Sequence, residues 1–284
     1  MILVTGAAGK TGREVIRRLA DADTEVRALV RTPEQVEPLL ALGACEARAG
    51  DLLRAADVSR AMEGVRAVYH ICPNVHPGEV EIGGLAIEAA IAARVDHFVF
   101  HSVLYADVEA MPHHWLKFQV EQKLRESGLA FTILRPCAYM QNLLAYLPAM
   151  RGHGRLAVPF GVLASFTLVD LRDVATAAAQ VLLNAGHERC TYDLCGPEAL
   201  SHTRVAGLFE SALERPVGAV GVDSSEWEDE ARVSGLSEYA IEALRRMFLW
   251  YDQHGFAGGS GDLESLLERP ASPLADFICE VTAR

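Results

Sequence analysis

Three glycines near the start of the chain have the spacing of a phosphate-binding turn. Gly6, Gly9 and Gly12 follow a short apolar run at residues 2–4, and an amphipathic stretch covers about residues 13–20. This order predicts a strand, a tight turn and a helix. Gly6 would permit the turn, Gly9 would admit a pyrophosphate and Gly12 would let the helix pack closely. We therefore predict a dinucleotide-binding site. The other expected contacts in this turn are Ala8, Lys10 and Thr11.

The same segment resembles, at Gly9-Lys10-Thr11, the end of the phosphate-binding loop of nucleoside triphosphatases. That loop needs a glycine five residues earlier, where this chain has Val4 inside the predicted strand. The spacing excludes an ATPase or a kinase. Lys10 is then expected to be a solvated turn residue, with a cofactor phosphate as its alternative partner.

The residues that follow the second and third predicted strands indicate which dinucleotide binds. Arg31 stands after the strand at 25–30, where an acidic residue would bind the ribose of NAD and an arginine suits a 2′-phosphate. We predict NADP(H) in preference to NAD(H), the alternative being that Arg31 is only a surface residue. Asp51, with Leu52 beside it, follows the third strand and would meet the adenine, or else cap the next helix.

Strand-like and helix-like segments alternate along the first half of the chain, as a parallel sheet covered by helices requires. The predicted strands are 2–5, 25–30, 46–49, 67–71, 97–101 and 130–134, and the predicted helices are 11–20, 33–42, 54–63, 79–93 and 114–127. The later elements are helix 173–183, strand 190–194, helix 202–214 and strand 217–222, followed by an acidic helical tail and a glycine-rich loop at 255–261. Ser272 and Pro273 would be the cap and the first turn of a last helix.

This pattern predicts an α/β protein with a doubly wound parallel sheet of the Rossmann type. Residues 1–136 would form the dinucleotide-binding core. Residues 137–284 would complete the sheet and form a small α/β region that acts as the substrate lid.

The overall composition limits the classes of function. The net charge of −12 argues against nucleic acid as a partner. The chain has no run of 18 apolar residues and no leader, so we expect a soluble cytoplasmic protein that does not bind membranes. The six cysteines lack paired spacing and are expected to be reduced thiols. No metal motif and no hydrolase nucleophile elbow is present, and adjacent His113 and His114 would point apart on a helix.

An ordered set of short motifs resembles the NmrA-like group of atypical short-chain dehydrogenases/reductases over nearly the whole chain. The matching stretches are 4–12, 29–31, 50–52, 127–129, 132–136 with Asn142, 169–175 and 194–201. The resemblance implies a Rossmann core, a small carboxy-terminal substrate domain and a preference for NADP(H). It also implies either a reductase of quinones, dyes or phenylpropanoids, or an NADP-sensing regulator without catalysis.

The wider superfamily uses a Tyr-x-x-x-Lys helix and a serine on the preceding strand. By this resemblance Lys117 would hold the nicotinamide ribose, or else be an exposed helix lysine. Ser102 occupies the serine position. His113 stands where the tyrosine is expected, and would donate the proton or merely precede the helix. Tyr105 is a second candidate acid.

Further cofactor contacts are expected where the chain leaves the fourth and sixth strands. They are Ile71, Cys72 and Pro73 after the fourth strand, and Pro136 and Tyr139 after the sixth. Cys72 and Cys137 would line the site without reacting. Tyr139, Met140, Trp115, Phe160 and Phe166 would either wall an apolar pocket or belong to the core.

The leading hypothesis is an NADPH-dependent reductase that transfers hydride to a carbonyl, a quinone or a polarised double bond of a small aromatic or apolar molecule. The first alternative is an inactive NADP(H) sensor with a protein partner. The second is a non-redox isomerase or cyclase on the same fold. Either a monomer or a homodimer is compatible with the sequence.

Overall fold

The computed structural model describes residues 1–283, which form two compact units. Unit 1 contains residues 1–107, 114–135 and 174–192, and unit 2 contains residues 108–113, 136–173 and those from 193 onward. Within the described residues, no helix combines the length and the apolar character that crossing a membrane requires.

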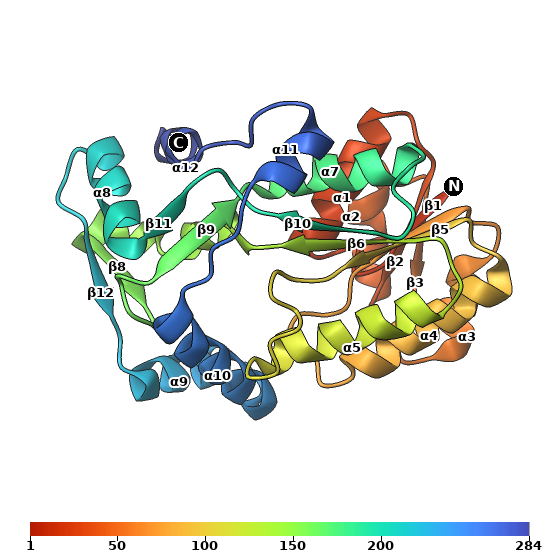
Figure 1. Cartoon of the computed structure of the whole chain (residues 1–284), viewed down its shortest axis with the longest axis horizontal. Coiled ribbons are helices and arrows are strands. Elements are labelled where there is room, and N and C mark those ends of the chain that lie inside the picture. Colours follow the sequence, from red (N-terminus) through yellow and green to blue (C-terminus); the bar gives the residue numbers. More distant parts are fainter. Residues whose placement is uncertain (284) are drawn as a thin grey trace. The chain divides into compact units, whose positions relative to one another are not determined.

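Unit 1 is built on a seven-stranded sheet with the strand order β10-β6-β5-β4-β1-β2-β3 (Figure 1). The strands are β1 (Ile2–Val4), β2 (Val26–Val30), β3 (Glu46–Ala49), β4 (Ala67–His70), β5 (His97–His101), β6 (Phe131–Pro136) and β10 (Cys190–Leu194). The pairs from β3 through β6 are parallel. Strand β10 also runs parallel to β6, because Arg189 donates to Phe131 near one end and Cys137 to Leu194 near the other. The predicted doubly wound α/β fold is confirmed.

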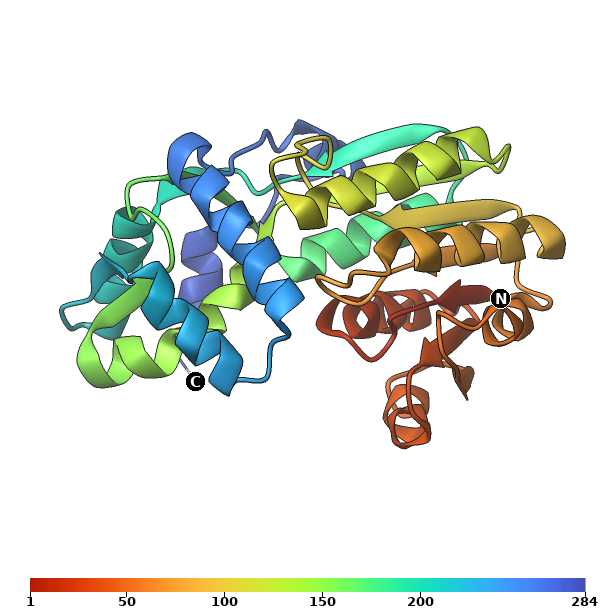
Figure 2. The same ribbon diagram turned by 90° about the horizontal axis from the view of Figure 1, so that it is seen from below.

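Helices cover both faces of this sheet, with α3, α4 and α5 on one face and α1, α2 and α7 on the other (Figures 1 and 2). Their bounds are α1 (Lys10–Asp21), α2 (Val36–Leu40) after the 3-10 turn η1 (Pro33–Gln35), α3 (Ala55–Met62), α4 (Glu79–Ala93), α5 (Pro112–Glu126) and α7 (Leu171–Leu183). The core under α3, α4 and α5 includes Met62, Ala86, Phe98, Phe100 and Val120. Burying such side chains supplies the main favourable free energy of the unit.

The closest approach of α4 to α5 depends on a glycine. A Cβ atom on Gly83 of α4 would lie 2.6 Å from a methyl carbon of Val120 on α5, so any larger residue would force the two helices or their side chains apart. The lack of a side chain at Gly83 therefore sets how these helices meet.

Two predicted helices differ from those observed. The segment predicted as helix 33–42 is a 3-10 turn, opened by a capping box at Thr32 and Gln35, followed by a helix of five residues. Pro38 has no backbone N–H to donate to the Glu34 carbonyl, so one continuous α-helix cannot form here. The helix predicted to begin at 114 begins at Pro112, since proline suits the first helical position. His113 and His114 therefore lie inside its first turn, not before it.

Unit 2 contains a three-stranded sheet, β11-β9-β7, and a two-stranded sheet, β12-β8. Its strands are β7 (Ala138–Tyr139), β8 (Arg155–Val158), β9 (Ser165–Val169), β11 (Ala199–Ser201) and β12 (Gly218–Gly221). Its helices are η2 (Met140–Ala145), α6 (Leu147–His153), α8 (His202–Leu213), α9 (Ser224–Val233), α10 (Glu238–His254), α11 (Gly261–Leu267) and α12 (Leu274–Thr282). The cap of α12 is Pro273 rather than the predicted Ser272, whose backbone N–H donates to Asp173.

Candidate functional site

The turn between β1 and α1 leaves no room for a side chain at Gly6 or Gly12. Gly6 has φ +57°, and a Cβ there would lie 2.9 Å from the carbonyl oxygen of Ile71. A Cβ on Gly12 would lie 2.6 Å from the carbonyl oxygen of Gly6, so α1 packs directly on the turn. Gly9 caps α1 without a side chain, and the first turn of α1 contains no acidic residue. This backbone fits a phosphate-bearing group, because the positive end of the helix is left uncovered.

Lys10 opens α1, so the expectation of a turn residue is wrong by one position. The side chain is exposed, yet neighbouring atoms shield it enough from water to lower its pKa. Ala8 lies in the turn before α1, and Thr11 lies in the first turn of α1. The six predicted residues of this motif therefore all lie in the turn after β1 or in the first turn of α1.

Thr5 ties the end of β1 to the end of β4. Its Oγ1 atom lies 2.9 Å from the backbone nitrogen of Ile71, 3.1 Å from the Ile71 carbonyl oxygen and 2.9 Å from Nδ1 of His70. Gly6 and Ile71 are therefore held against each other at the carboxyl edge of the sheet. This is the point at which the strand order turns from β1 to β4, where ligands bind in open α/β sheets.

Arg31 and Asp51 follow β2 and β3 at the same edge. Arg31 is exposed, and its backbone N–H donates to the side chain of Gln35. Asp51 accepts a hydrogen bond from the backbone of Leu53, whereas the cap residue of α3 is Arg54. The alternative that Asp51 caps this helix is therefore wrong, and Asp51 instead shapes the turn that precedes it. Leu52 is half-buried against the core of unit 1.

The chain leaving β4 passes Gly6 as Ile71, Cys72 and Pro73. Cys72 is buried, and burial together with the negative charge of Glu79 raises the pKa of its thiol. The thiol is protonated at neutral pH, which agrees with a lining rather than a reacting cysteine. Pro73 is exposed beside it.

Lys117 is buried, so the alternative of an exposed helix lysine is wrong. Its Nζ donates to Oε1 of Glu79 at 3.0 Å and to the carbonyl oxygen of His101 at 3.2 Å. The exposed fractions of the two side chains are 7% and 0%. Glu79 is the first residue of α4 and was not identified from the sequence. Its position 38 residues from Lys117 offers no local signal.

Ser102 is also paired with a buried carboxylate that is not evident from the sequence. Its Oγ donates to Oε1 of Glu121 at 2.5 Å. Arg135 donates to both oxygens of the same carboxylate, at 2.9 Å from Nε and 2.6 Å from Nη2. The single hydrogen of Ser102 is therefore used within the protein, and the hydroxyl offers a lone pair rather than a proton to a ligand. In the sequence, the spacing of four residues places Glu121 on the same face of α5 as Lys117, but it does not show that the carboxylate is buried.

Of the two adjacent histidines, His114 is held by hydrogen bonds to the backbone. Its Nδ1 lies 2.9 Å from the carbonyl oxygen of Leu104 and 3.3 Å from that of Tyr105, so the ring donates to this turn. Burial lowers the pKa of His114 to about 4, and the ring is neutral at pH 7. The contact supports Tyr105, which has φ +55°, in the left-handed region that a tyrosine seldom adopts.

The remaining predicted site residues lie in unit 2. They are His113, which is buried, Pro136 at the end of β6, and Tyr139 in β7. The structure thus gathers Gly6, Arg31, Cys72, Ser102 and Lys117 at one edge of the sheet of unit 1. The roles proposed for all of these side chains stay predictions.

The aromatic residues expected to wall a pocket belong to both units, and each has neighbours within its own unit. Trp115 stacks on Phe118 of α5 in unit 1, with ring centroids 5.3 Å apart. In unit 2, Phe160 stacks on Phe166 at 4.8 Å, and His202 packs edge-on against Phe166. Met140 is fully buried in the core of unit 2.

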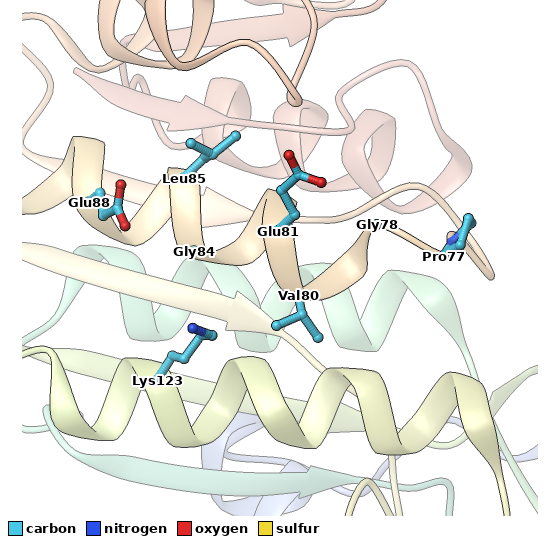
Figure 3. A pocket seen from close by; sticks show the side chains of 8 residues that line it. All are labelled: Pro77, Gly78, Val80, Glu81, Gly84, Leu85, Glu88 and Lys123. Carbon is cyan, nitrogen blue, oxygen red and sulfur yellow. The ribbon is translucent and has the colours of Figure 1, made fainter.

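A groove of about 490 Å³ runs along the outer side of α4 (Figure 3). Its lining residues are Pro77, Gly78, Val80, Glu81, Gly84, Leu85, Glu88 and Lys123. None of them is a predicted cofactor contact. Glu79 is adjacent in sequence to Val80 but fully buried, whereas Glu81 is exposed in the groove.

The sheet order and the glycine turn define the class of protein, a Rossmann-type α/β protein. The chain matches the NmrA-like family over residues 1–277 and belongs to that family. It is 34% identical to NAD(P)H azoreductase from Xenophilus azovorans, over 98% of this chain and 96% of the relative. It is also 34% identical to (4-alkanoyl-5-oxo-2,5-dihydrofuran-3-yl)methyl phosphate reductase from Streptomyces griseus, over 99% of this chain and 97% of the relative.

A similar solved structure is NADPH-dependent quinone oxidoreductase from Escherichia coli complexed with NADPH. It has a TM-score of 0.87 at 27% sequence identity, and the match covers 99% of each chain. The family predicted from the short motifs is confirmed.

Proposed function

We propose that this protein is an NADPH-dependent reductase that acts on a quinone, an azo compound or a polarised double bond of a small apolar or aromatic molecule. The observation that carries the proposal is full-length similarity to reductases, in particular 34% identity to NAD(P)H azoreductase. The similar proteins differ in the substrate that their names give, but each is a reductase or an oxidoreductase. The protein is an NAD(P)H-dependent reductase. The experiment has to identify the molecule that accepts its electrons.

The residues of unit 1 suit a dinucleotide phosphate. The glycine turn would hold the pyrophosphate, Arg31 would meet the 2′-phosphate, and Lys117 would donate to a ribose hydroxyl. When bound, the nicotinamide ring supplies the hydride. The protein then has to exclude water, orient the acceptor and deliver a proton.

The proposal takes Tyr105 and His113 as the two candidate proton donors. Ser102 donates its hydrogen to Glu121, which suits the serine to accept a hydrogen bond from a ligand. Tyr105→Phe and His113→Gln would each remove one candidate donor, and the variant with the larger loss of kcat identifies the donor.

The test is a fluorescence titration with NADPH and NADH, followed by an absorbance assay of nicotinamide oxidation with quinones, azo dyes and aromatic ketones. We expect selective NADPH binding and turnover, and Arg31→Ala should reduce the preference for NADPH over NADH by about tenfold. Tight NADPH binding without oxidation of any acceptor would instead indicate an NADP(H) sensor. Product formation without net oxidation would indicate an isomerase.

We also propose a cytoplasmic location and a monomer or homodimer in solution. All six cysteines are free, as suits a reducing compartment. Light scattering of the purified protein measures the oligomeric state directly.

A further inference from the structure

Glu79 is a buried carboxylate to which the proposed reaction has so far given no role. It is 0% exposed, and its Oε2 atom has no hydrogen-bond partner within residues 1–283. Its other oxygen binds the ammonium group of Lys117. A buried carboxylate costs free energy unless it is paired, so this position calls for an explanation.

The other groups that face Lys117 carry no charge at neutral pH. They are His70 of β4, His101 of β5, His114 of α5 and the Cys72 thiol after β4. Burial lowers the pKa values of His70 and His101 to about 3 and that of His114 to about 4, and it raises that of Cys72. Glu79 is therefore the counter-charge of Lys117 in this cluster.

The same contacts fix the direction of the ammonium group. Of the three hydrogens on Nζ, one goes to Glu79 and one to the carbonyl oxygen of His101, which leaves one for a ligand. Lys117 also lies over the ring of Phe100, with Nζ 5.4 Å from its centre. One turn further along each helix, Gly83 meets Val120 and sets the approach of α4 to α5. The position of Glu79 relative to Lys117 is thus built into the helix packing.

We propose that Glu79 is a positioning residue of the reductase, which holds Lys117 so that a single N–H group is presented to a hydroxyl oxygen of the bound nucleotide. The Glu79–Lys117 pair has no net charge, so it suits a neutral ribose hydroxyl better than a phosphate. This inference rests on the proposed function, because it requires that the protein bind NADPH.

The first test is a double-mutant cycle on NADPH binding, measured by fluorescence titration of the whole chain. Glu79→Gln keeps the shape of the side chain and removes its charge, and Lys117→Met removes the ammonium group. We expect about tenfold weaker NADPH binding for each, and no further loss for Glu79→Gln in the Lys117→Met background. Glu81→Gln, a change at the exposed glutamate on the same turn, should bind NADPH as the unmodified protein does.

Independent, additive losses from Glu79→Gln and Lys117→Met would overturn the inference, as would unchanged binding by Glu79→Gln. If Glu79→Gln does not fold, Glu79→Asp keeps the charge and withdraws the carboxylate by one methylene. A positioning role predicts several-fold weaker binding for this variant, whereas a role in charge balance alone predicts none. Failure of the unmodified protein to bind NADPH would contradict the proposed function, which is a separate result.

A second readout does not depend on the cofactor. The chain has only three lysines, Lys10, Lys117 and Lys123, so a sample labelled with ¹⁵N-lysine has three side-chain signals. The buried, paired ammonium of Lys117 should exchange hydrogen slowly and remain visible where the two exposed lysines are broadened. We expect Glu79→Gln to abolish this signal and Glu81→Gln to retain it. A signal that survives Glu79→Gln would show that Glu79 does not hold the ammonium group.

Discussion

The glycine turn and the contact between α4 and α5 are two halves of one candidate site, and the sequence encodes them differently. The turn is made of backbone, and its three glycines lie within seven consecutive positions. The helix contact is made of side chains, with Glu79 lying 38 residues from Lys117, and so is the neighbouring bond between Glu121 of α5 and Ser102, 19 residues before it. A site formed by backbone can therefore be recognised from the spacing of neighbouring residues in the sequence. A site formed by buried pairs depends on how two helices pack.

The largest expected effect is on the stability of the helix contact. Lys117→Met leaves the Glu79 carboxylate buried without its partner, and this should lower the free energy of unfolding by about 3–5 kcal/mol. Glu79→Gln together with Lys117→Met should cost less than the sum of the two single changes, because no uncompensated charge remains. Urea unfolding of the single and double variants checks this. Additive losses would mean that the two side chains are not coupled.

The second prediction concerns pH and applies to the histidines beside this contact. His70 and His101 have pKa values of about 3 when folded and about 6.5 when unfolded. Above pH 6.5 both states are neutral and the full stability is present. As the pH falls from 6.5 toward 3, the unfolded chain gains protons first, so stability declines by about 1.4 kcal/mol per pH unit for each ring.

The two rings together predict a loss of about 4 kcal/mol at pH 5, measured by urea unfolding at pH 7 and pH 5. His114 and His202, whose pKa values burial lowers to about 4, each add a further loss of about 2 kcal/mol. His101→Gln should therefore remove about 2 kcal/mol of the total loss. His153→Gln, at an exposed position, should leave it unchanged. A stability that does not change between these pH values would mean that the two rings are not held neutral.

The third prediction tests the turn. Gly12→Ala places a Cβ atom 2.6 Å from one backbone atom and 2.7 Å from another, and backbone cannot yield as a flexible side chain can. We expect about 100-fold weaker NADPH binding, equivalent to ~2.7 kcal/mol. Gly84→Ala on α4 is the matched control, since nothing lies within 4 Å of its Cβ. Equal affinity of the Gly12→Ala variant would exclude the turn as the phosphate site.

The smallest expected effect is on stability, and it compares two adjacent glycines of α4, Gly83 and Gly84. Gly83→Ala places its methyl group against the side chain of Val120, which can move, so we expect a loss of about 1–3 kcal/mol in stability. Val120→Ala in the same chain should restore part of it. Gly84→Ala, one residue along, should be neutral or slightly stabilising because it only raises helix propensity. Identical behaviour of the two glycine variants would contradict the role given to Gly83.

The fold and half of the site could be predicted because their signals are local. The β3, β5 and β10 strands and the α4 helix have the predicted bounds. The predicted helix at 33–42 is wrong because Pro38 lacks the backbone N–H that a continuous α-helix needs at that position. The start of α5 was wrong because Pro112 was not recognised as its first residue.

The side-chain half of the site was only partly predictable. Lys117 and Ser102 were found through the family resemblance, but their carboxylate partners were not. Glutamate is usually solvated, and no property of Glu79 or Glu121 in the sequence shows that it is buried. The burial arises from the fit of α4 and α5 on the sheet, which no single segment determines.

The hydrogen bonds of the Thr5 hydroxyl determine which ring nitrogen of His70 carries the proton. A hydroxyl has one hydrogen and two lone pairs, and Thr5 has three partners, the N–H and the carbonyl of Ile71 and Nδ1 of His70. All three are satisfied together only if the hydroxyl donates to the carbonyl and accepts from the other two. His70 must then be the Nδ1–H tautomer, which leaves a bare lone pair on its Nε2, an atom without a partner in residues 1–283. A threonine at the end of the first strand thus selects the tautomer of a histidine at the end of the fourth.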